Sequence, residues 1–186
     1  GAASAIFFNH GQCCCAGSRL YVDSTIFEKV VEGVAGLARN IRLGAGLDPE
    51  TEMGPLVSTE QLDRVCGYLE AGVAEGAKAV VGGRKASGTG YFVEPTVLVN
   101  TRENMKVVQE EIFGPVVTAG VWTRDISKAH SLASRLRAGT VWINCYNIFD
   151  AALPFGGYKQ SGWGREMGRD ALEMYTEVKA ICSRIA

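Results

Sequence analysis

The spacing of apolar residues changes repeatedly along the chain. In three stretches they recur every three to four residues, which predicts amphipathic helices that bury one face. Ser58 to Gln61 has the spacing of a capping box, so the second of these helices should begin there. The expected helices cover residues 24–37, 58–73 and 126–137, with shorter ones at 2–9 and 169–176.

Short β-prone runs lie between the expected helices. They cover residues 19–22, 77–81, 92–99, 115–122, 140–145 and 178–185. Alternation of helical and strand patterns is typical of an α/β layer architecture. The last run has no chain after it with which to pair, and an exposed terminal strand needs another element or subunit to cover it.

The composition fits one globular domain, with 186 residues, 47% hydrophobic and 21% charged. A formal net charge of -1 gives no electrostatic reason to expect nucleic acid or an acidic membrane as a partner. No apolar run approaches the roughly 18 residues of a membrane span. Residues 1–8 are apolar but lack the basic leading region of a signal peptide. Without an initial Met, Gly1 is interpreted as a processed end or an interior position of a longer protein.

Cysteine usage indicates a reducing compartment, the cytoplasm or a mitochondrial matrix. Three of the six cysteines are consecutive, and adjacent cysteines rarely bond to each other because disulfide geometry is demanding. Zinc is the competing interpretation of such a cluster, but the sequence has only two histidines and no second cysteine pair, so no metal is expected. The cysteines are Cys13, Cys14, Cys15, Cys66, Cys145 and Cys182.

The consecutive cysteines lie in a segment, residues 7–19, that reads Phe-Phe-Asn-His-Gly-Gln-Cys-Cys-Cys-Ala-Gly-Ser-Arg. A helix is expected to end at Gly11, after which the thiols follow in a bend of small residues. Such a bend brings backbone N–H groups close to a thiol, where they can lower its pKa and hold a developing oxyanion. A buried, unreactive cysteine is the alternative. The local pattern leaves both interpretations open.

A second unusual segment covers residues 147–164. It mixes Phe, Tyr and Trp with several glycines and shows little periodicity. Loops of this kind often line functional sites. A plain surface connection is the alternative.

Five segments together resemble the aldehyde dehydrogenase superfamily. They follow in the family's order and span nearly the whole chain. The resemblance implies an α/β, Rossmann-like catalytic domain with a parallel-rich sheet, of which this chain would be the C-terminal, cysteine-bearing part. The segments are residues 7–19, Glu-Glu-Ile-Phe-Gly-Pro at 110–115, Gly-Thr-Val-Trp-Ile-Asn at 139–144, the glycine-rich run 154–162 followed by Gly-Arg-Glu at 164–166, and Tyr-Thr-Glu-Val-Lys at 175–179.

The resemblance implies that Cys14, the second residue after Gly-Gln, is the nucleophile, with Cys13 and Cys15 as its neighbours. Its thiolate would attack an aldehyde to form a thiohemiacetal. Loss of hydride to NAD, or to NADP, would leave a thioester, and water would then release the carboxylic acid.

The same resemblance assigns binding residues. Glu111 and Phe113 match family residues that contact the cofactor, and Gln61 matches a polar contact to its ribose. Phe149 and Phe155 match the aromatic walls of the aldehyde tunnel.

Parts of the family pattern are not found in this sequence. They are the glycine-rich cofactor domain, the asparagine that completes the oxyanion hole and the glutamate that activates water. Roughly two dozen family residues are also missing between Gly120 and Val121, and losing a packed element of that size would exceed the marginal stability of a domain. A break in the sequence, a true deletion and a faulty gene prediction are the alternatives. The expected division is a catalytic domain over 1–173 and, over 174–186, a terminal strand that joins a partner in a homo-oligomer.

Two other functions remain open from the sequence. The chain could be a thiol esterase that needs no cofactor, in which His10 would have to pair with Cys14. It could also be a catalytically silent fragment that only assembles.

Overall fold

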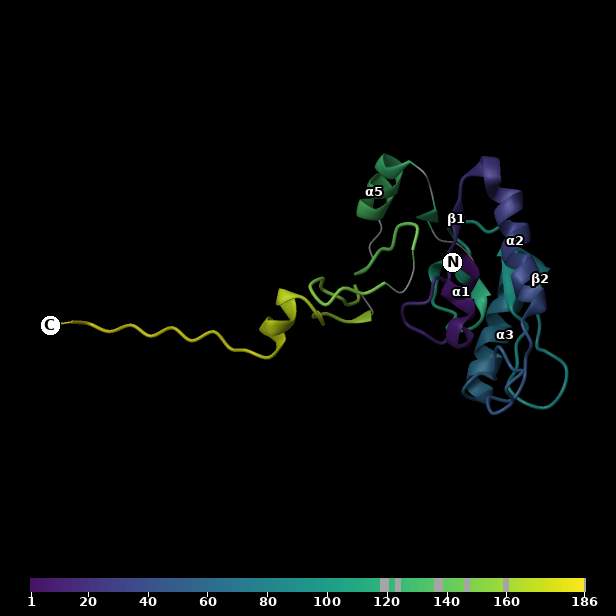
Figure 1. Ribbon diagram of the computed structural model, residues 1–186, viewed down its shortest axis with the longest axis horizontal. Coiled ribbons are helices and arrows are strands. Elements are labelled where there is room, and N and C mark those ends of the chain that lie inside the picture. The colour runs from purple at the N-terminus through teal and green to yellow at the C-terminus, as the bar shows by residue number, and fades with distance from the viewer. Residues whose placement is uncertain (118–120, 123–124, 136–138, 146–147, 159–160, 186) are drawn as a thin grey trace.

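The computed structural model describes residues 1–117, 121–122, 125–135, 139–145, 148–158 and 161–185 (Figure 1). Its longest helices are α2 and α3, and both were predicted. The α-helices are α1 (Ala2–Phe7), α2 (Phe27–Asn40), α3 (Thr59–Ala74), α4 (Lys106–Gln109) and α5 (Ile126–Arg135), and the 3₁₀ helices are η1 (Phe8–Gly11), η2 (Ser24–Ile26) and η4 (Arg169–Met174).

The strands form two small sheets. β2 and β3 pair antiparallel, and β3 pairs parallel with β4 in the order β2-β3-β4. β1 pairs parallel with β5 in a separate sheet. The strands are β1 (Tyr21–Val22), β2 (Lys78–Val81), β3 (Thr96–Val99), β4 (Val116–Val117) and β5 (Val121–Trp122).

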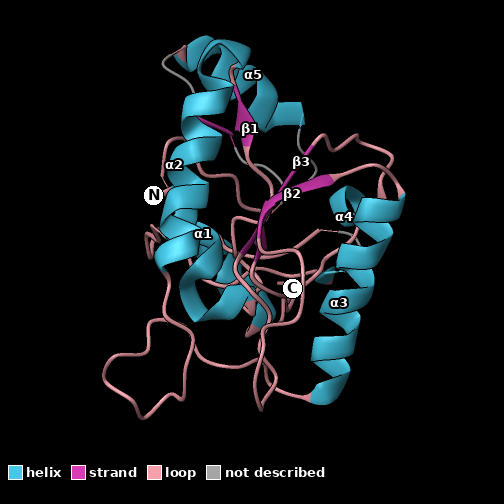
Figure 2. Ribbon diagram, turned by 90° about the vertical axis from the view of Figure 1, so that its right-hand side faces the viewer, coloured by secondary structure: helices cyan, strands magenta, loops and turns pink. Residues whose placement is uncertain are grey.

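β3 lies between the two long helices, which Figure 2 shows on opposite sides of the strands. Val97 is buried with side chains of α1 and α2, whereas Leu98 is buried with side chains of α3. Because successive residues of a strand point to opposite faces, α1 and α2 cover one face of the sheet and α3 covers the other. The α/β expectation is therefore confirmed.

The start of α3 follows from its sequence. The Ser58 hydroxyl accepts a hydrogen bond from the backbone N–H of Gln61 at 3.3 Å, which satisfies one of the free donors of the first turn. The buried stripe Leu62, Val65 and Leu69 then packs into the core. One half of the predicted capping box is thus present, while the side chain of Gln61 is used elsewhere.

Several predicted strands are wrong. The run 115–122 contains two short strands, β4 and β5, that belong to different sheets. Residues 140–145 are not a strand, and the buried Thr140 hydroxyl lacks a hydrogen-bond partner there. Residues 178–185 are also unpaired among the described residues, and Figure 1 shows them running away from the rest of the chain. A strand forms only where a neighbour offers hydrogen bonds, and these segments have none within reach.

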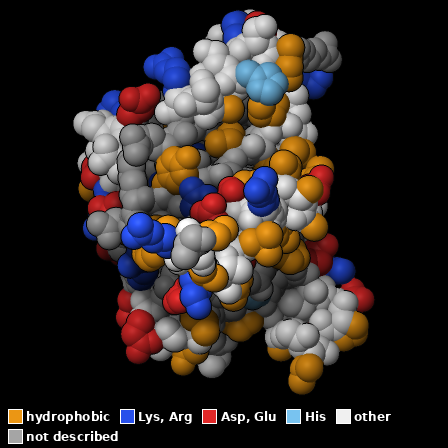
Figure 3. All heavy atoms as spheres, turned by 90° about the vertical axis from the view of Figure 1, so that its left-hand side faces the viewer, with side chains coloured by type: hydrophobic (Ala, Val, Ile, Leu, Met, Phe, Trp, Pro, Cys, Tyr) orange, Lys and Arg blue, Asp and Glu red, His pale blue; other side chains and the backbone are white. Residues whose placement is uncertain are grey.

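The C-terminal third contrasts with the layered part of the chain. In the described residues from 139 onward no residue is fully buried. Figure 3, viewed from the side of the C-terminus, shows many apolar side chains at the surface. The largest exposed ones in this region are Ile148, Leu153, Trp163, Leu172, Tyr175, Val178, Ile181 and Ile185. A contiguous apolar surface of this kind indicates a face made to contact more protein.

Candidate active site

The cysteine loop is anchored by a sharp change of direction after α1. Ile6 and Phe7 are buried, and Asn9, His10 and Gly11 then all adopt positive φ, at 49°, 56° and 67°. Left-handed residues end a helix and turn the chain back. The turn delivers the cysteines to the surface immediately beyond a rigid support.

Gln12 fixes the other side of this turn. Its side-chain oxygen accepts from the backbone N–H of Val57 at 3.1 Å, and its carbonyl accepts from the Asn9 side chain at 2.9 Å. Its amide nitrogen lies 3.5 Å from Nδ1 of His10. Burial lowers the pKa of His10, which favours the neutral imidazole.

The three thiols have different surroundings. Cys14 is exposed, whereas Cys13 and Cys15 are half-buried with their sulfur atoms 3.2 Å apart. The backbone N–H of Ala16 donates to the Cys13 carbonyl at 2.9 Å and closes a turn around Cys14. The middle cysteine therefore stands at the tip of the turn while its neighbours face one another below it.

Cys15 is expected to resist alkylation at alkaline pH. Burial, followed by the hydrogen bond to Cys13, raises the pKa of the Cys15 thiol from 9.0 to about 12. The fold thus favours the neutral thiol, a stabilisation present in full below pH 9 and lost as the pH rises through about 12. Mass spectrometry after brief iodoacetamide treatment at pH 8–10 should find Cys14 labelled and Cys15 unlabelled. Equal labelling of both in the native chain would contradict this, and both should react in urea.

The cysteine loop touches the segment that carries Glu111 and Phe113. A Cβ built on Gly11 would lie 2.1 Å from the carbonyl oxygen of Gly114, so the two backbones meet where only glycine fits. Gly114 in turn lies against Val65 of α3. The nucleophile loop and the predicted cofactor segment are therefore held at one fixed separation.

Four side chains hold residues 108–113 in place. Arg19 donates to the carbonyls of Val108 at 2.5 Å and Glu110 at 3.1 Å, and it follows the cysteine loop by only a few residues. From α3, Arg64 donates to the Glu111 carbonyl at 2.9 Å. Charged donors make strong hydrogen bonds, and these fix a backbone that has no strand partner of its own.

Gln61 and Tyr68 complete this set from α3. The Gln61 amide donates to the carbonyls of Ile112 at 3.2 Å and Phe113 at 2.8 Å. The Tyr68 hydroxyl donates to the Glu110 carboxylate at 2.7 Å, and burial followed by this contact raises the pKa of the phenol. Gln61 therefore contacts the predicted cofactor segment, and its assignment to the ribose stays a prediction.

The segment itself presents two groups for binding. Glu111 is exposed, and Phe113 is half-buried with a φ of 60°. A positive φ in an aromatic residue is costly, and such strain gathers at binding sites. The backbone of Phe113 is held in this conformation by Gln61.

Phe149 and Phe155 are brought together in the C-terminal third. Their ring centroids lie 5.4 Å apart in an edge-to-face arrangement, and Trp142 stacks on Phe149 in the same way at 5.5 Å. The Trp142 indole N–H donates to the Ile148 carbonyl at 2.9 Å. These residues form an aromatic cluster in the loop that Figure 1 shows in green beside α1.

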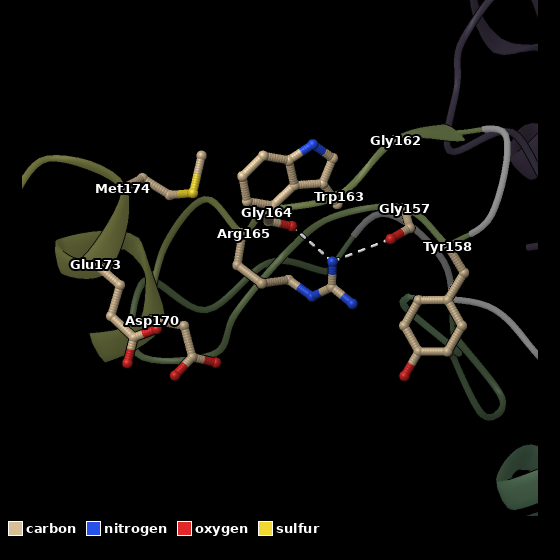
Figure 4. Close-up of a pocket in the computed structure, with 9 residues that line it drawn as sticks. All are labelled: Gly157, Tyr158, Gly162, Trp163, Gly164, Arg165, Asp170, Glu173 and Met174. Atoms are coloured by element: carbon tan, nitrogen blue, oxygen red, sulfur yellow. Dashed lines mark hydrogen bonds between the residues drawn. The ribbon is translucent and has the colours of Figure 1, made fainter.

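The glycine-rich run beyond this cluster folds around Arg165 (Figure 4). Its guanidinium donates to the carbonyls of Gly157 at 3.0 Å and Gly164 at 2.6 Å, and it lies 5.2 Å from the centre of the Tyr158 ring. The hollow beside it has a volume of about 700 Å³. It is lined by Gly157, Tyr158, Gly162, Trp163, Gly164, Arg165, Asp170, Glu173 and Met174.

Sequence reasoning missed Arg19, Arg64 and Tyr68. Each acts on a segment 42 to 91 positions away, and no local pattern marks such a contact. Within the described part of the chain no group of three metal-binding side chains comes together, and no helix has the length and apolar character needed to cross a membrane.

An α/β domain that places an exposed cysteine beside a strained acidic-aromatic segment is typical of an enzyme with a covalent thiol intermediate. The family described as "Aldehyde dehydrogenase family" matches residues 1–119 and 117–181. The chain belongs to the aldehyde dehydrogenase family.

Individual relatives agree with this assignment. DhaS of Bacillus subtilis (strain 168) is 50% identical over 203 residues, covering 97% of this chain and 41% of that protein. The mitochondrial aldehyde dehydrogenase of Homo sapiens is 42% identical over 203 residues, covering 97% and 39%. The NAD+ complex of aldehyde dehydrogenase from Bacillus cereus superposes with a TM-score of 0.91 at 48% identity, covering 100% and 42%. The chain thus spans about 40% of the length of these relatives.

Proposed function

We propose that this chain is the cysteine-bearing part of an enzyme that oxidises an aldehyde to a carboxylic acid with NAD or NADP. One observation carries the proposal. The exposed Cys14 stands on a turn locked against the Glu110–Pro115 segment through the contact of Gly11 with Gly114. A nucleophile and a cofactor edge need such a fixed separation for hydride transfer.

The chemistry at Cys14 follows from its position. The thiolate adds to the aldehyde carbon, and backbone N–H groups of the turn hold the resulting oxyanion. Bound NAD(P)+ supplies the hydride acceptor. Loss of hydride from the thiohemiacetal carbon leaves a thioester on Cys14, and addition of water with departure of the thiolate gives the acid.

The residues present fit one end of the cofactor. The exposed Glu111 carboxylate accepts hydrogen bonds, which suits the ribose hydroxyls next to nicotinamide. Phe113 offers a ring held in one conformation through its backbone, which suits the nicotinamide plane. We assign Gln61 to the ribose as a further contact.

The substrate wall is assigned to Phe149 and Phe155. Their edge-to-face contact makes a rigid apolar surface, and such a surface removes water from an aldehyde and orients it. We further propose that residues 174–186 pair with a second copy of the chain. Support comes from the exposed Tyr175, Val178 and Ile181, which have no cover in the chain itself. The six free thiols support a reducing compartment, such as the cytoplasm or a mitochondrial matrix.

Absorbance at 340 nm with a panel of aldehydes tests the reaction. We expect NADH formation that needs both nucleotide and aldehyde, is lost in Cys14→Ser and is retained in Cys182→Ser, a control at another exposed cysteine. Oxidation by Cys14→Ser as fast as by the parent would refute the proposal. Absence of NADH with the parent would favour a fragment that only assembles.

Esterase activity without nucleotide is the second candidate. It needs a histidine that activates Cys14, whereas Nδ1 of His10 lies against the side chain of Gln12. Turnover of p-nitrophenyl acetate that persists without nucleotide and disappears in both His10→Ala and Cys14→Ser would favour it.

A further inference from the structure

The two edges of β3 are paired to different extents. On one edge, Val97, Leu98 and Val99 pair with residues of β2. On the other edge, β4 pairs only with Thr96 and Val97 and then stops. Leu98 and Val99 have no strand partner on that edge within the described residues, although β3 is the central strand of its sheet.

A hollow of about 370 Å³ lies beside this unpaired edge. β3 forms one wall, β1 forms another and side chains of α2 contribute the rest. Val117, the last residue of β4, is also part of the lining. The lining residues are Leu20, Tyr21, Val22, Phe27, Val31, Val34, Val97, Leu98, Val99, Asn100, Thr101, Arg102, Glu103, Val108 and Val117.

The lining is apolar where a strand would pass. Tyr21 and Phe27 are 42% and 36% exposed, while Val31 and Val99 are only half-buried. A strand inside a sheet covered on both faces carries apolar residues on both sides and would cover these side chains. The hollow thus combines unpaired backbone edges with apolar walls.

The sequence is interrupted at the same place. Only three residues separate Val117 of β4 from Val121 of β5. The two matches to the family end and resume at residues 117–119. An alignment of 203 positions uses 97% of 186 residues, about 180, so about two dozen positions of the relative have no counterpart in this chain.

We propose that the hollow between β1 and β3 is an unfilled strand position whose occupant is a continuation of β4. In the relatives, the two dozen or so additional residues would supply this continuation. It would pair with Leu98 and Val99 on one side and with β1 on the other. The two small sheets would then become one sheet in the order β5-β1-β4-β3-β2. This inference concerns the fold and holds whether or not the chain oxidises aldehydes.

Insertion of the corresponding DhaS residues between Gly120 and Val121 tests the proposal. Amide hydrogen exchange of Leu98, Val99 and Val22 should slow by about tenfold or more, because paired amides exchange only through local opening. Binding of the dye ANS to the parent chain should fall at the same time, since the apolar walls become covered.

Two substitutions in α2 make the test specific. In the inserted chain, Val31→Lys lies in the hollow and should return the exchange of Leu98 and Val99 to the parent rate. Leu37→Lys is the matched control, on the same helix but 59% exposed and outside the hollow, and it should change nothing. Slow exchange of α3 amides in every variant verifies that each is folded.

Other outcomes would overturn the proposal. Unchanged exchange at Leu98 and Val99 in a folded inserted chain would show that the added residues lie elsewhere. Prior protection of these amides in a parent that elutes as a dimer would show that a second copy fills the hollow.

Discussion

Gly11→Ala is expected to lower the free energy of unfolding by about 2–5 kcal/mol. The added Cβ would lie 2.1 Å from the Gly114 carbonyl oxygen, and the residue would keep a φ of 67°, where side chains are strained. The strain and the displaced backbone both oppose folding. Urea denaturation followed by circular dichroism measures the change, which is a large part of the 5–15 kcal/mol typical of a domain.

Gly33→Ala is the matched control. Gly33 lies in α2, and nothing is within 4 Å of a Cβ built there. Alanine favours a helix over glycine by about 0.5–1 kcal/mol, so this variant should be slightly more stable than the parent. If both variants unfolded at the parent's midpoint, the contact of the cysteine loop with Gly114 would not be a structural requirement.

The two long helices could be predicted from sequence because their signals are local. Ser58 precedes an apolar stripe at helical spacing, and both the cap and the stripe act within α3 itself. The strand at 140–145 failed for the opposite reason. Its β-prone composition says that it fits a sheet, but only a neighbouring strand can supply the pairing, and Thr140 has none.

The candidate site divides in the same way. Cys14 could be predicted because the glycine, the small residues and the cysteines are adjacent in sequence. Its relation to Glu111 could not, because it depends on a backbone contact between Gly11 and Gly114 and on a hydrogen bond from Arg19 to Glu110, 91 positions later. Such contacts arise only when α1, α3 and the sheet pack together.

The cysteine loop and residues 108–113 therefore behave as one unit. Gly11 sets how closely they approach, and side chains from both directions fix the carbonyls of the second segment. Residues from 139 onward, by contrast, contribute no fully buried residue where they are described. Stability should thus be concentrated around the nucleophile, and the aromatic cluster should open at lower denaturant.

Arg19→Met is expected to lower the free energy of unfolding by about 2–3 kcal/mol, since hydrogen bonds from charged donors are each worth about 1.5–3 kcal/mol and these are partly exposed to water. Methionine keeps the apolar stem but leaves the carbonyls of Val108 and Glu110 without their donor. Urea denaturation gives the change, and Arg19→Lys should recover only part of it because an ammonium lacks the planar fork that reaches both carbonyls.

Arg39→Met provides the comparison for Arg19. Arg39 also donates to a backbone carbonyl, that of Val80, but through one exposed hydrogen bond of 3.4 Å. Its loss should change stability by less than about 0.5 kcal/mol, as for most surface substitutions. A loss at Arg39 equal to that at Arg19 would show that arginine stems, rather than the paired carbonyls beside Cys14, account for the effect. The stronger dependence on Arg19 follows from its position, because it is the side chain that ties the strand after the nucleophile to the segment that holds Glu111.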